Sequence, residues 1–220
     1  MKVLKFGGSS LASVARFSEV ASIVKGSAVC ESLVLVLSAP HGVTNTLVNL
    51  VAQAQSGQDY QADLDSLQTH FYSLVKNAQA QLDTETFSTL IDFTDKHLEF
   101  LSQYLQGIRL LSYCPDTIQA KILGAGEQFS VQLMFALLQS LQAQVQILDS
   151  VQYVKSQGDY LNAVADIPAT QAAFSSVDFT KPNQIWVMAG FVSSLPSDEL
   201  ALLGRNGSDY SAAIIAAGIN

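Results

Sequence analysis

The residues best suited to bind phosphate lie in a glycine-containing segment near the start of the chain. Residues 5–10 read Lys-Phe-Gly-Gly-Ser-Ser and begin within the short strand-like run 3–6, which stops at Gly7. Adjacent glycines let the main chain approach a ligand closely, and amides at the start of a helix attract anions. Lys5 adds a full positive charge there. A tight turn followed by a helix cap explains the same residues equally well, and the Walker phosphate-loop spacing occurs nowhere in the chain.

A second glycine-containing segment, at 204–209, reads Gly-Arg-Asn-Gly-Ser-Asp and precedes a predicted helix. Arg205 offers a planar fork of donors that fits a carboxylate. Asp209 could organise a lysine or a magnesium ion. The alternative without a ligand is a hairpin exit followed by an aspartate cap.

Two more segments place polar side chains where a ligand could bind. Ser38 and Thr44 follow the apolar run 33–37, and ligands of open α/β sheets bind beyond the carboxyl ends of the strands. Glu127 follows Gly-Ala-Gly at 124–126, which interrupts a helical stretch, and its carboxylate could meet an ammonium group. From the residues alone, a capped loop and a helix kink with an exposed acid are the preferred interpretations.

Several other chemistries have no support in the sequence. His41, His70 and His97 lack the spacing of metal ligands, so we expect them on the surface. The two cysteines, Cys30 and Cys114, are too few for a disulfide framework and indicate a reduced, cytoplasmic compartment. No apolar run is long enough for a membrane span. The net charge of −8 argues against nucleic-acid binding.

The apolar pattern predicts the elements that hold these segments. The runs 3–6 and 33–37 are typical of strands, and a helical pattern follows each of them. Two such units predict a parallel sheet with helices on its faces. The caps that we expect are Ser9 or Ser10 for the first helix, Thr44 or Asn45 for the second, and Ser208 or Asp209 for the last.

Helical patterns dominate the middle of the chain. We expect a helical insertion at about 57–110 and a helical stretch at 116–141, while 150–180 gives no clear assignment. The apolar helix at 212–217 has no strand after it, so we expect the chain to stop inside its domain. The remaining predictions are strands at 145–148 and 185–188, and a hairpin formed by 191–192 and 200–203.

Four segments together resemble the aspartate kinase branch of the amino-acid kinase family. They are KFGGSS at 5–10, LSAPHGVTN at 37–45, GAGE at 124–127 and GRNGSDYSAA at 204–213, and their order spans essentially the whole chain. The helical stretch 105–115, which overlaps QGIRLLSYCPD at 106–116, is most similar to threonine-sensitive bifunctional aspartokinase–homoserine dehydrogenases. Ser9 departs from the threonine that the family often has, but keeps the hydroxyl.

The resemblance implies an α/β fold, a three-layer αβα sandwich with a mainly parallel sheet, truncated at its C-terminus. Residues 1–220 would be the N-terminal, amino-acid-binding portion of the catalytic domain, without most of the ATP-binding lobe. The implied reaction transfers the ATP γ-phosphoryl group to the side-chain carboxylate of L-aspartate, giving 4-aspartyl phosphate. This is the first step of lysine, threonine and methionine biosynthesis. The implied cofactors and partners are ATP, Mg²⁺ and L-aspartate, in a homo-oligomer.

The resemblance also assigns roles to residues of this chain. Lys5 and Asp209 would be catalytic, and no residue would bind a metal directly. The aspartate would contact Thr44, Glu127, Arg205 and Ser208, whereas the phosphates would contact Lys5, Gly7, Gly8, Ser9 and Ser38. A carboxylate nucleophile is already ionised at neutral pH, which explains why no general base is needed.

Three functions stay open at this point. The first is an aspartate kinase fragment that is inactive as an isolated chain. The second is a non-catalytic amino-acid-binding module. The third is a sister kinase that acts on another carboxylate or on a carbamate.

Overall fold

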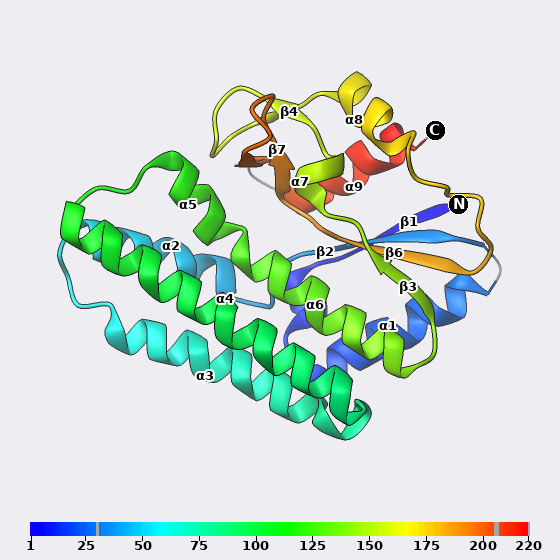
Figure 1. Cartoon of the computed structure of the whole chain (residues 1–220), viewed down its shortest axis with the longest axis horizontal. Helices are drawn as coiled ribbons and strands as arrows, with labels where there is room; N and C mark the ends of the chain where they lie inside the picture. Colours follow the sequence, from blue (N-terminus) through cyan, green and yellow to red (C-terminus); the bar gives the residue numbers. More distant parts are fainter. Residues whose placement is uncertain (30, 205–206, 220) are drawn as a thin grey trace.

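A parallel four-stranded sheet lies at the centre of the molecule (Figure 1). The computed structural model describes residues 1–29, 31–204 and 207–219. Every pair of neighbouring strands in this sheet is parallel, as the two strand–helix units predict. The strands, in sheet order, are β1 (Lys2–Phe6), β2 (Leu33–Leu37), β6 (Gln184–Ala189) and β3 (Gln144–Ile147).

Helices cover both faces of this sheet and complete the three predicted layers. The residues of β2 are all buried because Leu35 points into one core and Val36 into the other. Ile215 lies in the same core as Val36, on the second face. The first face is covered by α1 (Val14–Ala28) and α6 (Ala125–Ser140), and the second by α8 (Ile167–Phe174) and α9 (Gly207–Gly218).

The predicted helical insertion consists of two long helices that pack outside α6 (Figure 1). Phe71 and Phe129 stack with ring centroids 4.0 Å apart, which joins the insertion to α6. A 3₁₀ turn, η2 (Gln79–Gln81), connects the two helices of the insertion, α3 (Gln61–Ala78) and α4 (Thr84–Leu111). The helices of this region are α2 (Val43–Gln55), α3 (Gln61–Ala78), α4 (Thr84–Leu111) and α5 (Asp116–Leu123).

The predicted hairpin is present and precedes the 204–209 segment. The region 150–180, which the sequence left unassigned, packs beside it. Tyr160 O accepts a hydrogen bond from the N–H of Leu202 at 2.7 Å. The hairpin is β7 (Val192–Ser194) with β8 (Leu200–Leu202), and the unassigned region contains α7 (Ser150–Tyr153), β4 (Ser156–Gln157), β5 (Val164–Ala165) and α8.

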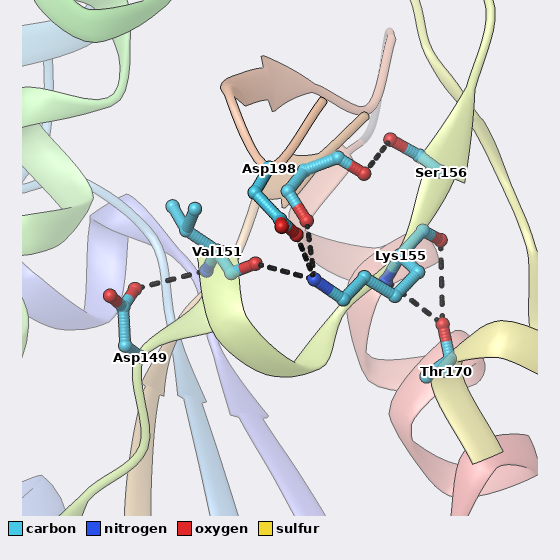
Figure 2. Close-up of polar contacts among 7 residues, drawn as sticks. Asp149, Val151, Lys155, Ser156, Thr170 and Asp198 are labelled. Atoms are coloured by element: carbon cyan, nitrogen blue, oxygen red, sulfur yellow. Dashed lines mark hydrogen bonds and ion pairs between the residues drawn. The ribbon is translucent and has the colours of Figure 1, made fainter. Parts of the chain in front are cut away.

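Lys155 fastens this hairpin to the rest of the fold (Figure 2). Its Nζ lies 2.9 Å from Asp198 Oδ1 and donates to Ser194 Oγ at 3.1 Å. Its backbone N–H donates to Thr170 Oγ1 at 3.0 Å, so one residue joins α8 to the hairpin. The hairpin is therefore held at its tip as well as along its strands.

The predicted helix caps are wrong by a few residues. Ser13 caps α1, and its hydroxyl accepts from the N–H of Arg16, because Ser9 and Ser10 lie in the 3₁₀ turn η1 (Gly8–Leu11). Gly42, with φ +81°, precedes α2, so Thr44 and Asn45 lie inside that helix. Similarly, Ser208 and Asp209 lie within α9 rather than before it.

His97 is buried, which corrects the prediction that it lies on the surface. Its side chain continues the apolar face of α4, and its Nε2 lies 2.9 Å from Ala125 O at the start of α6. Its ring stacks on Phe93, and burial lowers the pKa of His97. In the described ranges, no helix combines the length and apolarity that crossing a membrane requires.

Candidate functional site

A cavity of about 740 Å³ lies where the loops after β1 and β2 meet. Both strands run in the same direction, so their carboxyl ends share one edge of the sheet. Loops and helix starts that are far apart in the sequence form its walls. The lining residues are Gly8, Ser9, Ser38, Ala39, Pro40, His41, Gly42, Thr44, Asn45, Glu127, Leu161, Asn162, Phe191 and Gly204.

The glycine pair after β1 packs directly against the loop after β2. A Cβ on Gly8 would lie 3.0 Å from Ala39 O, so any side chain there would force the two loops apart. A Cβ on Gly7 would lie 3.3 Å from Lys5 Nζ, which places this ammonium beside the turn. Gly8 therefore lets the main chain approach the loop after β2 at the cavity wall, and Lys5 places a positive charge beside the neighbouring Gly7.

Lys5 forms an ion pair with Asp209 of α9. The Nζ–Oδ1 distance is 2.7 Å, and the lysine side chain is 22% exposed while the aspartate side chain is 70% exposed. The pair joins the end of β1 to the first turn of α9, although the two residues are far apart in the sequence. Because the pair is partly solvated, its carboxylate can exchange Lys5 for another ligand at modest cost.

Glu127 is buried in the first turn of α6, and this corrects the interpretation as an exposed acid. The residue is only 4% exposed, and its Oε2 has no hydrogen-bond partner among the described residues. Burial raises the pKa of Glu127 to about 8, and the backbone N–H of Ala39 offsets only part of that effect. An unpartnered buried carboxyl at a cavity wall is an incomplete interaction that a cationic ligand group would complete.

Gly126 explains why Glu127 is buried. A Cβ on Gly126 would lie 2.6 Å from the Cβ of Ala39 and 2.9 Å from Cγ1 of Val43. The glycine thus lets α6 press against the loop after β2. His97 supports the same helix start from the other side through Ala125 O. The break that the sequence indicates at 124–126 therefore serves close packing.

Replacing Gly126 with alanine is expected to destabilise the protein by roughly 1–3 kcal/mol, because the new methyl group overlaps the 38–43 loop. The matched control is Gly107→Ala, in α4, where an added Cβ meets nothing within 4 Å. That variant should be stabilised by about 0.5–1 kcal/mol. Thermal melting of both variants measures the difference, and equal melting temperatures would contradict the packing argument.

The structure brings most of the predicted site residues together. Five of them line the cavity, and Lys5 and Asp209 are paired beside the turn at Gly7. Arg205 and the side chain of Ser208 lie outside the described part of the chain. The five predicted site residues that line the cavity are Gly8, Ser9, Ser38, Thr44 and Glu127.

Three lining residues, Leu161, Asn162 and Phe191, lie outside the segments that the sequence predicts for the site. Asn162 belongs to the region without a clear pattern, so nothing in the sequence marked it. Phe191 has φ +65°, and its N–H donates to Ser211 Oγ at 2.8 Å. A non-glycine residue with positive φ is uncommon and is worth examining at a site, but it leaves no trace in the sequence.

A profile of the amino-acid kinase family matches residues 1–220. The chain is 35% identical, over 218 residues, to a bifunctional aspartokinase/homoserine dehydrogenase of Buchnera aphidicola subsp. Acyrthosiphon pisum, covering 99% of this chain and 27% of that protein. It is 34% identical to the protein of the same description from Haemophilus influenzae, covering 99% and 26%. The chain therefore spans about a quarter of the length of these curated relatives.

The fold matches a solved structure, that of E. coli aspartokinase III in complex with aspartate and ADP. The TM-score is 0.86 over 100% of this chain and 47% of that chain, at 24% sequence identity. At this identity the match shows that the two proteins share a fold.

Proposed function

This chain belongs to the amino-acid kinase family, and we propose that its cavity is the L-aspartate site of an aspartate kinase. In the proposed reaction, the side-chain carboxylate of L-aspartate takes the γ-phosphoryl group of ATP and becomes 4-aspartyl phosphate. The identity to bifunctional aspartokinase/homoserine dehydrogenases supports this choice within the family. So does the presence of aspartate and ADP in the E. coli aspartokinase III complex.

The observation that carries the proposal is the unpartnered Oε2 of Glu127 at the cavity wall. A buried carboxylate without a partner is costly, and an ammonium group would remove most of that cost. An α-amino acid supplies such a group on a small, rigid frame. Thr44 lines the same cavity and would donate its hydroxyl to the bound amino acid. Arg205 and Ser208 are proposed to hold the α-carboxylate.

The phosphoryl end of the site is proposed to lie at the glycine turn. Lys5 would neutralise charge on the transferred group, the amides of Gly7 and Gly8 would bind phosphate oxygens, and the hydroxyls of Ser9 and Ser38 would lie beside them. Asp209 would hold Lys5 in place through their ion pair. Because the attacking carboxylate is ionised at neutral pH, this chain needs to supply position and positive charge rather than a base.

Mg²⁺ is proposed to enter the site with the nucleotide. The described residues contain no group of three potential metal ligands, so the phosphates would supply most of the coordination. When bound, the ion would neutralise charge on the phosphates. The chain would then contribute at most a single carboxylate, which fits a site where Asp209 is already paired with Lys5.

The chain is further proposed to form the amino-acid-binding lobe of the catalytic domain, with the helical insertion at about 57–110, and to work as a homo-oligomer. Lysine, threonine and methionine biosynthesis is the proposed pathway, in the cytoplasm.

A non-catalytic amino-acid-binding module would use the same cavity without phosphoryl transfer. The isolated chain is expected to form almost no ADP from MgATP and L-aspartate in either case, so binding of a phosphate chain at the glycine turn separates the two.

Calorimetric titration with three small acids tests the amino-acid site. L-Aspartate is expected to bind more tightly than succinate by roughly 100-fold, because succinate keeps both carboxylates but lacks the ammonium that would face Glu127. L-Glutamate should bind less tightly than L-aspartate, because its longer side chain moves the carboxylate away from the expected transfer position. Equal affinity for succinate and L-aspartate would contradict the proposal, and tighter binding of L-glutamate would favour a sister kinase.

A further inference from the structure

Asn162 is held rigidly at the cavity wall by the neighbouring main chain. Tyr160 O accepts from Leu202 N–H at 2.7 Å, and Ala163 N–H donates to Leu202 O at 2.8 Å. These two bonds bracket Asn162 and attach it to β8. Ala163 is 3% exposed and packs in a small core with Ala201. The position of Asn162 is therefore set before any ligand arrives, as preorganised binding requires.

The side chain of Asn162 lies directly on Gly204. A Cβ on Gly204 would lie only 2.0 Å from Asn162 Oδ1 and 3.2 Å from its Cγ, so a side chain at 204 and the present position of Asn162 are incompatible. Both residues line the cavity. The absence of a side chain at Gly204 thus leaves room for the Asn162 amide. In the sequence, Gly204 directly precedes Arg205.

This amide has no assigned function so far. No described residue forms a hydrogen bond with its side chain, and its Oδ1 is turned toward Gly204. The Nδ2 is the atom that remains for a ligand, and it is a hydrogen-bond donor. An uncharged donor suits a carboxylate that a positive group also contacts, because it adds a charge-assisted bond without another charge.

We propose that Asn162 is a further substrate-binding residue, whose Nδ2–H donates to the α-carboxylate of the bound amino acid. The inference rests on the proposed L-aspartate site. Glu127 stands at the start of α6 and takes the ammonium there, whereas Asn162 belongs to the wall formed beside β8. The ammonium and the α-carboxylate are bonded to the same carbon and point in different directions, so each group faces a different wall of the cavity. Asn162 then distinguishes an α-carboxylate from an α-amide.

The test compares two ligands and two substitutions by calorimetry on the whole chain. L-Aspartate and its α-amide, L-isoasparagine, differ only at the group that Asn162 contacts. N162A should weaken L-aspartate binding by roughly tenfold, because one bond to a charged group is lost. N162D should weaken it by roughly 100-fold through repulsion, yet change L-isoasparagine binding by less than about threefold, because the ligand amide donates to the new carboxylate.

The control is N77D, on the exposed surface of α3, which makes the same change of charge far from the cavity. It should leave both affinities within about twofold of the wild type. Wild-type affinity for L-aspartate in both N162A and N162D would overturn the inference. If N162D does not fold by circular dichroism, N162A decides alone. Failure of the wild-type chain to bind L-aspartate at all would instead reject the proposed function.

Discussion

Glu127→Gln is expected to abolish the proton release that accompanies L-aspartate binding at pH 7, and to weaken binding by roughly 100-fold. The pKa of Glu127 is raised to about 8 by burial, so the carboxyl is mostly protonated at pH 7 before the ligand arrives. The substrate ammonium favours the ionised form, and binding must therefore expel about one proton. Glutamine has no proton to lose and no charge to offer.

The raised pKa of Glu127 also fixes the direction in which the affinity for L-aspartate changes with pH. Below pH 8 the affinity for L-aspartate should rise by up to about tenfold per pH unit, and above pH 8 it should level off. Calorimetry in two buffers with different ionisation enthalpies counts the released protons. Glu99→Gln, at an exposed position of α4, is the matched control and should retain the release. Unchanged proton release in E127Q would show that Glu127 does not receive the ammonium.

The same carboxyl should make the unliganded protein less stable at high pH. A folded-state pKa of about 8 exceeds the ordinary value of 4.5, so stability is highest below pH 4.5 and falls as the pH rises through 8. The total effect is a few kcal/mol. E127Q should remove this dependence and therefore melt at a higher temperature than the wild type at pH 8. This gain in stability separates a site residue from one that merely supports the fold.

Lys5→Met and Asp209→Asn are expected to shift the affinity for inorganic tripolyphosphate in opposite directions. Lys5 Nζ lies beside Gly7 and is paired with Asp209 at 2.7 Å. Removing the lysine deletes the positive charge at the proposed phosphate site, so binding should weaken by at least about tenfold. Removing the aspartate charge leaves the lysine unpaired and takes a negative charge away from the proposed phosphate site. Binding should therefore strengthen by several-fold, which is the effect expected of one exposed charge.

Tripolyphosphate is the chosen probe because it presents the phosphate chain of a nucleotide without the nucleobase and ribose. Calorimetry at low salt measures its affinity. A second ion pair on the same strand provides the control. Lys2 Nζ lies 2.6 Å from Glu31 Oε1, at the beginning of β1 rather than its end. K2M and E31Q make the same changes of charge there and should alter the affinity by less than about twofold. Equal effects of K5M and K2M would argue against a phosphate site at the glycine turn.

The strands of the central sheet and the glycine-containing turns are predictable from the sequence because their signals are local. A run such as 33–37 is apolar throughout because both faces of β2 are covered, and the break at 124–126 is marked by its glycines. The four motifs were also sufficient to recognise the family, which the profile match confirms. Such features depend on the residues themselves, not on distant partners.

The burial of particular polar residues was not predictable, because it depends on packing between distant segments. Glu127 is buried because Gly126 lets α6 press on the loop after β2, a contact that joins positions far apart in the sequence. His97 is buried because α4 needs an apolar face there and Ala125 O accepts its N–H. Asn162 sits in a segment whose strands are too short to leave a periodic pattern.

A crystal structure of the chain grown with L-aspartate would show whether Glu127 receives the ammonium group of the ligand. We expect the ligand in the cavity between the loops after β1 and β2, with its ammonium about 3 Å from Glu127 Oε2 and its side-chain carboxylate directed toward Gly8. An L-aspartate molecule bound in this cavity with its ammonium away from Glu127, or bound only at another place, would contradict this expectation.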